Sequence, residues 1–289
     1  MPIDTDQTQT LNIKTTTNPL GQEVSYHDQY QPSLLFPIAR KIKRDELGLK
    51  SSLPFHGQDI WNAYELSWLN KLGLPQVAIA EFRFPADSPN IVESKSLKLY
   101  LNSLNQTIVE DWQTLRTLIE KDLSKVAEAN VEVILTELTE KDKYQIDSLK
   151  ADCIDQQTIK IEHYNYQANL LNLDLSAQLS QQIVSESLCS HLLKSNCLIT
   201  NQPDWASIFI QYTGAAVCHA SLLKYLVSFR SHNEFHEQCV ERIFIDFMNV
   251  CKPKKLTVYA RYTRRGGLDI NPWRSNCLQN MDNIRLARQ

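Results

Sequence analysis

A short set of residues occurs twice in this chain at a constant separation. Two serines and a tyrosine recur 125 positions further on, where Ser96, Tyr100 and Ser103 are matched by Ser221, Tyr225 and Ser228. The apolar pattern around each set predicts the same order of elements, which is strand, strand, helix, helix, strand. Identical order at a fixed offset indicates an internal duplication, so the chain is expected to fold as two copies of one unit.

Alternating apolar residues predict the strands of each copy, and apolar residues at helical spacing predict the helices. In the first copy the strands are 59–69, 77–84 and 130–138, and the helices are 93–103 and 112–126. In the second copy the strands are 183–195, 206–213 and 256–262, and the helices are 218–229 and 235–250. Antiparallel sheets that each carry two helices on one face make an α+β fold. The chain has no GxGxxG motif, so a Rossmann domain is not expected.

The duplication divides the chain into three parts. Residues 1–32 begin with a tract rich in Thr, Asp and Gln and are predicted to be a flexible lead. Residues 33–150 form the first module and residues 151–289 the second, with a polar linker around 141–167. The segment 34–49 has a mixed pattern interrupted by proline, and no element is predicted there.

Bulk properties exclude several classes of function. A formal net charge of −3 argues against nucleic acid as the main partner. No apolar run approaches the ~20 residues of a membrane span, and the N-terminus has no signal-peptide core. The seven cysteines are widely spaced and include no CxxC pair, which argues against a disulfide framework and a cysteine zinc site. These features predict a protein of the reducing cytoplasm.

Cys197 lies in a polar turn, and a carboxylate, Asp204, follows seven positions later. Apolar runs on both sides predict two strands joined by this turn. A free thiol has a pKa near ~8.5, so a nucleophilic cysteine needs an activating partner. The charge of Asp204 disfavours a thiolate, and Asp204 therefore fits better as a proton carrier in a covalent mechanism. The alternative is that Cys197 is a buried thiol and Asp204 a turn residue.

The two copies differ just before their first helices. The first copy has Glu93-Ser94-Lys95 where the second has Cys218-His219-Ala220. A carboxylate, a hydroxyl and a cation at the start of a helix could bind the polar edge of one ligand and the phosphate of another. Alternatively, Ser94 or Ser96 could cap the helix while the lysines are solvated.

Histidines and an acid open the second helix of the second copy. His232 and His236 are four residues apart and could bind zinc, but the order is not HExxH and no third ligand is evident. Glu237 could accept a pair of N–H donors from a guanine-type ring. It could equally be an ordinary acid at a helix N-terminus.

The run from Arg261 to Arg274 is the basic, glycine-containing loop of the chain. Its backbone at Gly266-Gly267 can approach a ligand closely, and its guanidinium groups could hold a phosphorylated nucleotide such as NADPH. A plain surface hairpin is the alternative.

Four motifs follow one another along the chain: Glu93-Ser94-Lys95-Ser96-Leu97-Lys98-Leu99-Tyr100, Ser195-Asn196-Cys197 with Asp204, His236-Glu237, and Arg265-Gly266-Gly267-Leu268-Asp269-Ile270-Asn271-Pro272. In this order they resemble the motifs of the NADPH-dependent 7-cyano-7-deazaguanine reductases, the nitrile reductases of queuosine biosynthesis, in their long two-module form. The resemblance covers nearly the whole chain after its first thirty or so residues.

The resemblance implies tandem tunnelling-fold (T-fold) modules, a homodimer, NADPH as co-substrate and no metal. Cys197 would attack the nitrile carbon to give a thioimide, and Asp204 would protonate the developing nitrogen. Two hydrides from two NADPH would then give 7-aminomethyl-7-deazaguanine. The base would contact Ile91, Val92, Glu93, His236 and Glu237, and NADPH would contact Ser94, Lys95, Arg265 and Gly266. With the first motif in one module and the nucleophile in the other, the site is expected between the modules.

Two other functions would use the same residues. A cysteine-dependent hydrolase of a purine-like substrate would release ammonia without NADPH and would leave the basic loop without a purpose. A purine-binding module would not turn its ligand over, so Cys197→Ala would keep full affinity and no adduct would form. No direct contact with nucleic acid or membrane is expected in any of these cases.

Overall fold

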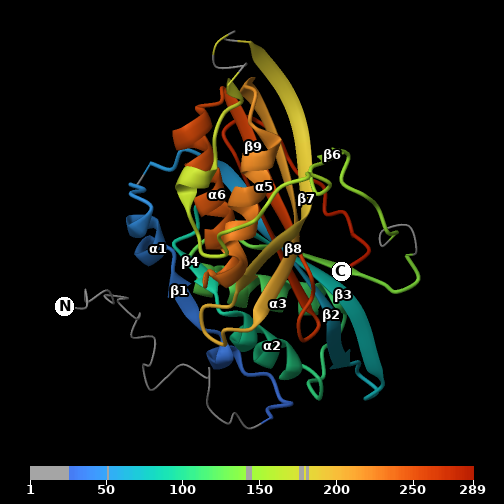
Figure 1. The fold of residues 1–289 in the computed structure, drawn as a ribbon. Helices are drawn as coiled ribbons and strands as arrows, with labels where there is room; N and C mark the ends of the chain where they lie inside the picture. The colour runs from blue at the N-terminus through green and yellow to red at the C-terminus, as the bar shows by residue number, and fades with distance from the viewer. Residues whose placement is uncertain (1–25, 51, 141–144, 176–178, 180–181) are drawn as a thin grey trace, which may run out of the picture.

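The computed structural model describes residues 26–50, 52–140, 145–175, 179 and 182–289. The strands are β1 Pro37–Ala39, β2 His56–Leu69, β3 Pro75–Pro85, β4 Asn90–Val92, β5 Glu132–Thr136, β6 Asp152–Cys153, β7 Ile183–Asn196, β8 Pro203–Ala215, β9 Lys255–Tyr262 and β10 Leu268–Ser275. The helices are α1 Lys41–Glu46, α2 Ser94–Asn102, α3 Trp112–Ala127, α5 His219–Ser228 and α6 His236–Cys251, with short 3-10 turns at Pro32–Leu34, Ala168–Leu170 and Phe229–Ser231. Figure 1 shows their arrangement.

The six strands and four helices predicted from the sequence are confirmed to within a few residues at most ends. Local chemistry fixes several of these ends. The side chain of Asp111 caps α3 by accepting from the backbone N–H of Thr114 at 2.7 Å. Glu128 and Lys252, with φ of 55° and 45°, end α3 and α6 in the left-handed conformation. The elements that were not predicted are α1, β1, β4, β6 and β10.

The two halves share one sheet, which differs from the prediction of a sheet in each half. Eight described strands are ordered β5-β3-β2-β10-β9-β8-β7-β6, and β1 and β4 form a separate pair. The sheet is continuous because β10, from the end of the chain, pairs with β2 along its whole length and also with β9. All pairs are antiparallel except the short β6–β7 pair.

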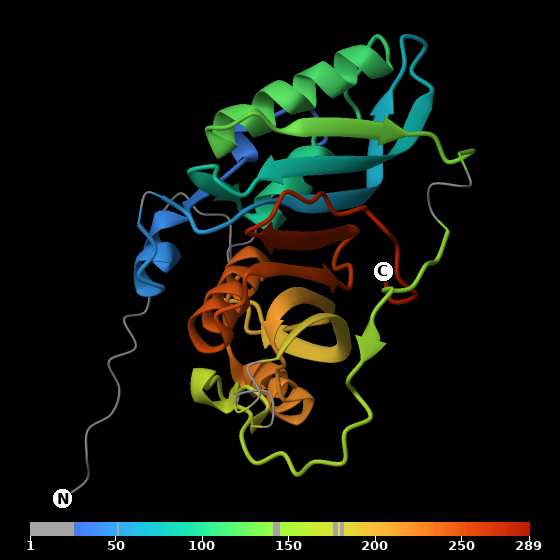
Figure 2. The same cartoon turned by 90° about the horizontal axis from the view of Figure 1, so that it is seen from above.

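Two hydrophobic clusters lie between the sheet and its helices. One joins α2 and α3 to β2 and β3, and it includes Leu268 and Ile270 of β10. The other joins α5 and α6 to β7, β8 and β9. A smaller cluster lies on the other face of the sheet, away from these helices, and consists of Ile60, Phe209, Tyr259 and Trp273. In Figure 2 the two halves lie on opposite sides of the molecule, with β10 where they meet.

The halves make matching polar contacts. In each half two tyrosines donate to one aspartate: Tyr30 and Tyr100 to Asp122 at 2.8 and 2.7 Å, and Tyr166 and Tyr225 to Asp246 at 2.7 and 2.6 Å. The first long strand of each half is irregular at the equivalent place, between Ala63 and Leu66 in β2 and between Ser190 and Leu193 in β7.

The predicted lead is partly packed. Tyr30 and Gln31 bond to the first half, Gln31 through its backbone N–H to Ser103 Oγ at 3.1 Å. Residues 1–25 of the lead lie outside the described residues. Among the helices that the structure describes, none is long and apolar enough to cross a bilayer.

Candidate active site

A cavity of about 450 Å³ is lined by residues from both halves of the chain. Four segments surround it: the start of α2, the β7–β8 turn, the start of α6 and the β9–β10 turn. All the predicted site residues line this one cavity, namely Ile91, Val92, Glu93, Ser94, Lys95, Cys197, Asp204, His236, Glu237, Arg265 and Gly266. The fold therefore brings together residues that are up to 175 positions apart in the sequence.

Cys197 is the first residue after β7, in the turn that joins β7 to β8. Its backbone closes the turn, because its N–H donates to Gln202 O at 2.8 Å and its carbonyl accepts from Asn201 N–H at 3.0 Å. The hairpin register pairs Ser195 with Asp204, which places Cys197 and Asp204 on neighbouring strand ends. The predicted hairpin is thus confirmed, and Cys197 is partly exposed toward the cavity.

Asp204 is a buried carboxylate with Arg265 and His236 as neighbours. Its Oδ1 accepts from the Arg265 guanidinium and lies 3.6 Å from His236 Nε2. Burial alone would raise the pKa of Asp204, but His236 and Arg265 together hold it below its ordinary value. Asp204 is therefore an anion at neutral pH while Arg265 is beside it. His236 is held in turn by the ring of Tyr262, whose centroid is 4.1 Å away.

Glu93 forms the N-cap of α2. Its carboxylate oxygens accept from the backbone N–H groups of Lys95 and Ser96 at 2.9 and 2.7 Å. The suggestion that Ser94 or Ser96 caps this helix is therefore wrong, and the hydroxyl of Ser96 instead donates to the Glu93 carbonyl at 2.7 Å. Burial raises the pKa of Glu93, opposed by these N–H donors. Each oxygen has a further lone pair that a ligand N–H could use.

Glu237 and His236 are the first residues of α6 and point into the same cavity. Burial, followed by the charge of Asp59, raises the pKa of Glu237 to about 7. His232 lies elsewhere, with its Nε2 3.0 Å from Glu234, whereas His236 lies near Asp204. The two histidines thus have different partners, and this arrangement does not favour the zinc alternative.

The predicted basic loop is mostly a buried strand. Only residues 263–267 form the turn between β9 and β10, and Arg265 and Leu268 close it with reciprocal backbone hydrogen bonds of 2.8 and 3.1 Å. Gly266 and Gly267 have φ of 57° and 79°, as a tight two-residue hairpin requires. Arg261 and Arg274 are buried in β9 and β10, so the expectation that they hold a nucleotide is wrong. Of the arginines in this run, Arg265 lines the cavity.

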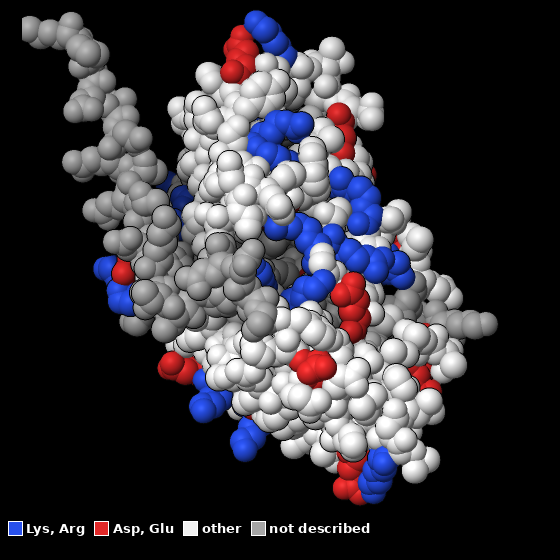
Figure 3. Space-filling model, turned by 90° about the horizontal axis from the view of Figure 1, so that it is seen from below, with Lys and Arg blue, Asp and Glu red and all other residues white. Residues whose placement is uncertain are grey.

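Cations gather at the end of the molecule that carries α2 and the β9–β10 turn. Figure 3 shows Lys and Arg side chains around a hollow on this face. Lys95, Lys98 and Arg265 all line the cavity, and Lys98 Nζ also donates to the Gly266 carbonyl. This contact ties α2 of the first half to the turn from the second half.

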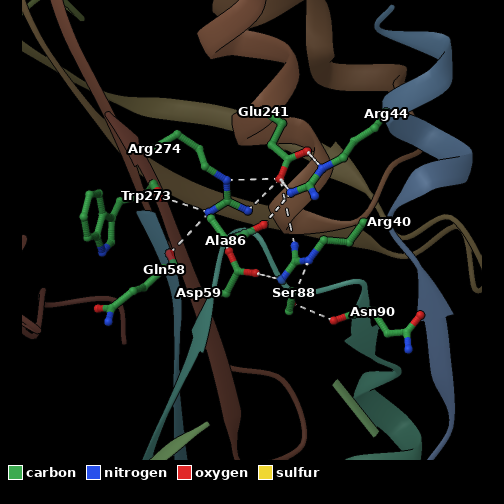
Figure 4. A network of polar contacts seen from close by, with 10 residues as sticks. All are labelled: Arg40, Arg44, Gln58, Asp59, Ala86, Ser88, Asn90, Glu241, Trp273 and Arg274. Atoms are coloured by element: carbon green, nitrogen blue, oxygen red, sulfur yellow. Dashed lines mark hydrogen bonds and ion pairs between the residues drawn. The ribbon is translucent and has the colours of Figure 1, made fainter. Parts of the chain in front are cut away.

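A buried network of charged residues is built around Glu241 and Asp59 (Figure 4). Glu241, one turn further along α6, accepts from Arg44 at 2.6 and 2.9 Å and from Arg274 at 2.9 and 3.1 Å. Asp59 accepts from Arg274 at 2.8 Å and from Arg40. All five side chains are buried, and they come from both halves. The network fixes α6, and with it Glu237, against the first half.

Several cavity residues were not predicted: Trp61, Lys98, Thr200, Gln202, Glu234, Phe235, Thr263, Leu268 and Ile270. Lys98, Leu268 and Ile270 lie inside the quoted motifs and Phe235 lies next to one, and their position there was the available signal. Trp61 is a buried strand residue whose local pattern says nothing about a ligand.

The comparisons with known proteins agree with these motifs. Residues 26–135 match the family described as "Nitrile reductase, 7-cyano-7-deazaguanine-reductase N-term", and residues 203–281 match "QueF-like protein". An NADPH-dependent 7-cyano-7-deazaguanine reductase from Chromobacterium violaceum is 55% identical over 284 residues, covering 96% of this chain and 100% of the relative. A crystal structure of the archaeosine synthase QueF-Like in the apo form matches with 16% identity and a TM-score of 0.30, covering 34% of this chain and 96% of its own.

Proposed function

The chain belongs to the NADPH-dependent 7-cyano-7-deazaguanine reductases, and on this premise we propose that Cys197 attacks the nitrile carbon of the substrate. The enzyme is an oxidoreductase of the queuosine pathway that takes its reducing equivalents from NADPH. The observation that carries the proposal is the single cavity in which the thiol of Cys197, the carboxylate of Asp204 and the acids Glu93 and Glu237 meet.

The covalent step balances with groups that line the cavity. The Cys197 sulfur forms a bond to the nitrile carbon while one carbon–nitrogen π bond breaks and its electrons move to nitrogen. The proton leaves Cys197, is carried by the anionic Asp204 and is delivered to the nitrogen, so that a neutral thioimide results. The position of Asp204 beside the turn of Cys197 supports this role.

The acids would hold the base. Glu93 and Glu237 are buried carboxylates that open α2 and α6, and a guanine-type edge offers paired N–H donors to such groups. Backbone and side chains of Ile91, Val92 and His236 would complete the contact. Two acids that keep the substrate in one orientation would present its nitrile to Cys197.

The residues at the basic end of the cavity fit NADPH. Lys95 and Arg265 offer an ammonium and a guanidinium group to phosphate, and Ser94 beside them carries a hydroxyl. Gly266 has a φ of 57°, which residues with a side chain rarely adopt, so the turn favours glycine there. When bound, NADPH supplies the hydride.

The two halves, 33–150 and 151–289, are proposed to be tandem T-fold modules. The matching tyrosine–aspartate contacts and strand irregularities support this division. The family also suggests a homodimer in the cytoplasm, for which sedimentation equilibrium would give twice the mass of one chain. The hydrolase alternative has no observation in its favour, since the 55% identical relative is a reductase.

Substrate affinity is expected to depend on the ionisation of Glu237. N–H donors of the base favour the carboxylate, so affinity should fall as Glu237 becomes protonated below its pKa of about 7. The loss should approach about tenfold per pH unit below that value, and affinity should level off above it. Calorimetric titration from pH 5.5 to 8.5 measures this. Glu237→Gln should bind the substrate weakly and with an affinity that depends little on pH. Glu110→Gln, at an exposed position, should keep the wild-type pH dependence. A wild-type affinity that does not change with pH would contradict the role of Glu237.

Arg265→Met is expected to have two separable effects. Loss of a charge-assisted contact should raise the KM for NADPH by about tenfold or more. Loss of the cation beside Asp204 should raise the pKa of that carboxyl, so the protonated form persists to higher pH. The pH profile of the rate of Cys197 adduct formation should therefore shift toward higher pH. Arg264→Met, on the same turn, is the control and should do neither; equal behaviour of the two variants would rule out the role of Arg265.

The reaction itself is tested by stoichiometry. Two NADPH should be oxidised for each 7-aminomethyl-7-deazaguanine formed, measured by absorbance and by mass spectrometry of the product. Release of ammonia without NADPH oxidation would refute the reductase.

A further inference from the structure

Three metal-ligating side chains lie together on the sheet, away from the cavity. Ligand atoms of Cys153, Cys189 and His191 are all within 4.8 Å of one another. The parallel β6–β7 pair sets Cys153 directly opposite Cys189, and His191 follows two positions later on β7, on the same side of the strand. We propose that these three residues form a binding site for zinc or a similar thiophilic divalent cation.

The site belongs to the sheet face that the helices do not cover. In the strand register Cys189 faces Phe209, Phe209 faces Tyr259 and Tyr259 faces Trp273, so Cys189 continues the row of the small cluster on that face. None of the three ligands lines the active-site cavity. The buried thiol of Cys189 lies inside, whereas Cys153 and His191 are exposed, which gives an ion a path from solvent.

His191 is oriented by its neighbours. Its Nδ1 is 2.8 Å from Ser207 Oγ, and Nε2 has no hydrogen bond among the described residues, so Nε2 is available as a ligand. The backbone N–H of His191 and the hydroxyl of Ser190 both donate to Asp155, at 2.9 and 2.6 Å. A ligating histidine usually has its second ring nitrogen held in this way, and the surrounding bonds fix the ring for binding.

Charge and distance are compatible with a bound cation. The carboxylates Asp152 and Asp155 lie near Cys189, and their negative charge favours a cation there. The thiols of Cys153 and Cys189 would release their protons when they bind it. Arg288, which donates to the His191 carbonyl, is a positive charge near the site and would oppose the binding of a cation. Zn–S and Zn–N bonds of about 2.3 and 2.0–2.1 Å place tetrahedral ligand atoms roughly 3.4–3.8 Å apart. Rotation of the side chains is enough to bring the three ligand atoms from within 4.8 Å to this separation. Water would be the fourth ligand.

Cobalt titration of the full-length Cys197→Ala protein, reduced and freed of metal, tests the site. The active-site thiol is removed so that only other cysteines can give a thiolate-to-cobalt charge-transfer band. One Co²⁺ per chain is expected, displaced by Zn²⁺. Cys153→Ser and His191→Gln, both at exposed positions, should weaken binding at least about tenfold. Cys277→Ser, a partly exposed thiol outside the group, is the matched control and should bind as the parent does.

The other outcomes overturn the proposal. These are no charge-transfer band, a band unchanged by Cys153→Ser and Cys189→Ser, or equal loss in the Cys277→Ser control. Failure here leaves the reductase proposal untouched, because no ligand of this site lines the active-site cavity.

Discussion

Cys197→Ala is expected to abolish nitrile reduction while the protein stays folded and still binds its substrate. Among the described residues that line the cavity, Cys197 is the only cysteine, so no second thiol can replace it. Loss of a covalent nucleophile should lower kcat/KM by on the order of 10⁴-fold or more. NADPH oxidation followed by absorbance measures the rate, and calorimetry measures the affinity.

The control for this substitution is Cys218→Ala. Cys218 occupies the position in the second half that Glu93 has in the first, at the N-cap of α5, and its side chain makes no capping bond. Its replacement should leave the rate within about twofold of wild type. Turnover by Cys197→Ala close to that of Cys218→Ala would remove the nucleophile from the mechanism.

Glu241→Gln should produce the largest loss of stability. Glu241 is 1% exposed and bonds to Arg44 and Arg274, with Arg40 3.9 Å away. Removing its charge takes away the carboxylate partner of Arg44 and leaves Arg40 and Arg274 with Asp59. Breaking a buried pair by removing one member costs about 3–5 kcal/mol, and that loss is expected in the free energy of unfolding. Chemical denaturation monitored by circular dichroism measures it.

Glu46→Gln is the matched control, since Glu46 is 46% exposed and lies 2.8 Å from Lys43 and 3.8 Å from Arg242. It should change the free energy of unfolding by less than about 1 kcal/mol. Equal effects of the two substitutions would show that the network contributes little.

The same network predicts how stability depends on pH. Burial opposes ionisation of Asp59 and Glu241, but the arginines outweigh it and hold both pKa values below their ordinary range. Carboxyls with a depressed folded-state pKa stabilise the fold above their unfolded pKa of about 4. This contribution is lost as the pH falls further, through the folded pKa values. Wild type should therefore lose stability on acidification more steeply than Glu241→Gln.

Local patterns were sufficient for most of the elements. Helical spacing in α3 and α6 and alternation in β2 and β8 follow directly from which faces are buried, and such patterns are contained within a few residues. The motifs also predicted which residues line the cavity, although their individual roles stay predictions.

Long-range pairing explains what was missed. β10 contains Asp269, Asn271 and Arg274, which made it look like a surface loop, yet all its residues are buried. Its polar groups find partners far away in sequence, as when Asp269 accepts from Asn62 at 2.7 Å and from Tyr64 at 2.6 Å. Cys153 and Cys189 are far apart in the sequence, and their wide spacing argued against a metal site, yet the pairing of β6 with β7 places them opposite each other. Neither this pairing nor the pairing of β10 with β2 can be predicted from a few neighbouring residues.

The most direct test is the intact mass of the protein after incubation with 7-cyano-7-deazaguanine in the absence of NADPH. Addition to a nitrile has no leaving group, so the mass should increase by one whole substrate, and the increase should require Cys197. It should disappear when NADPH is added and consumed. A wild-type enzyme that turns over with NADPH but never carries this mass, or an adduct that clears as fast without NADPH, would contradict the thioimide mechanism.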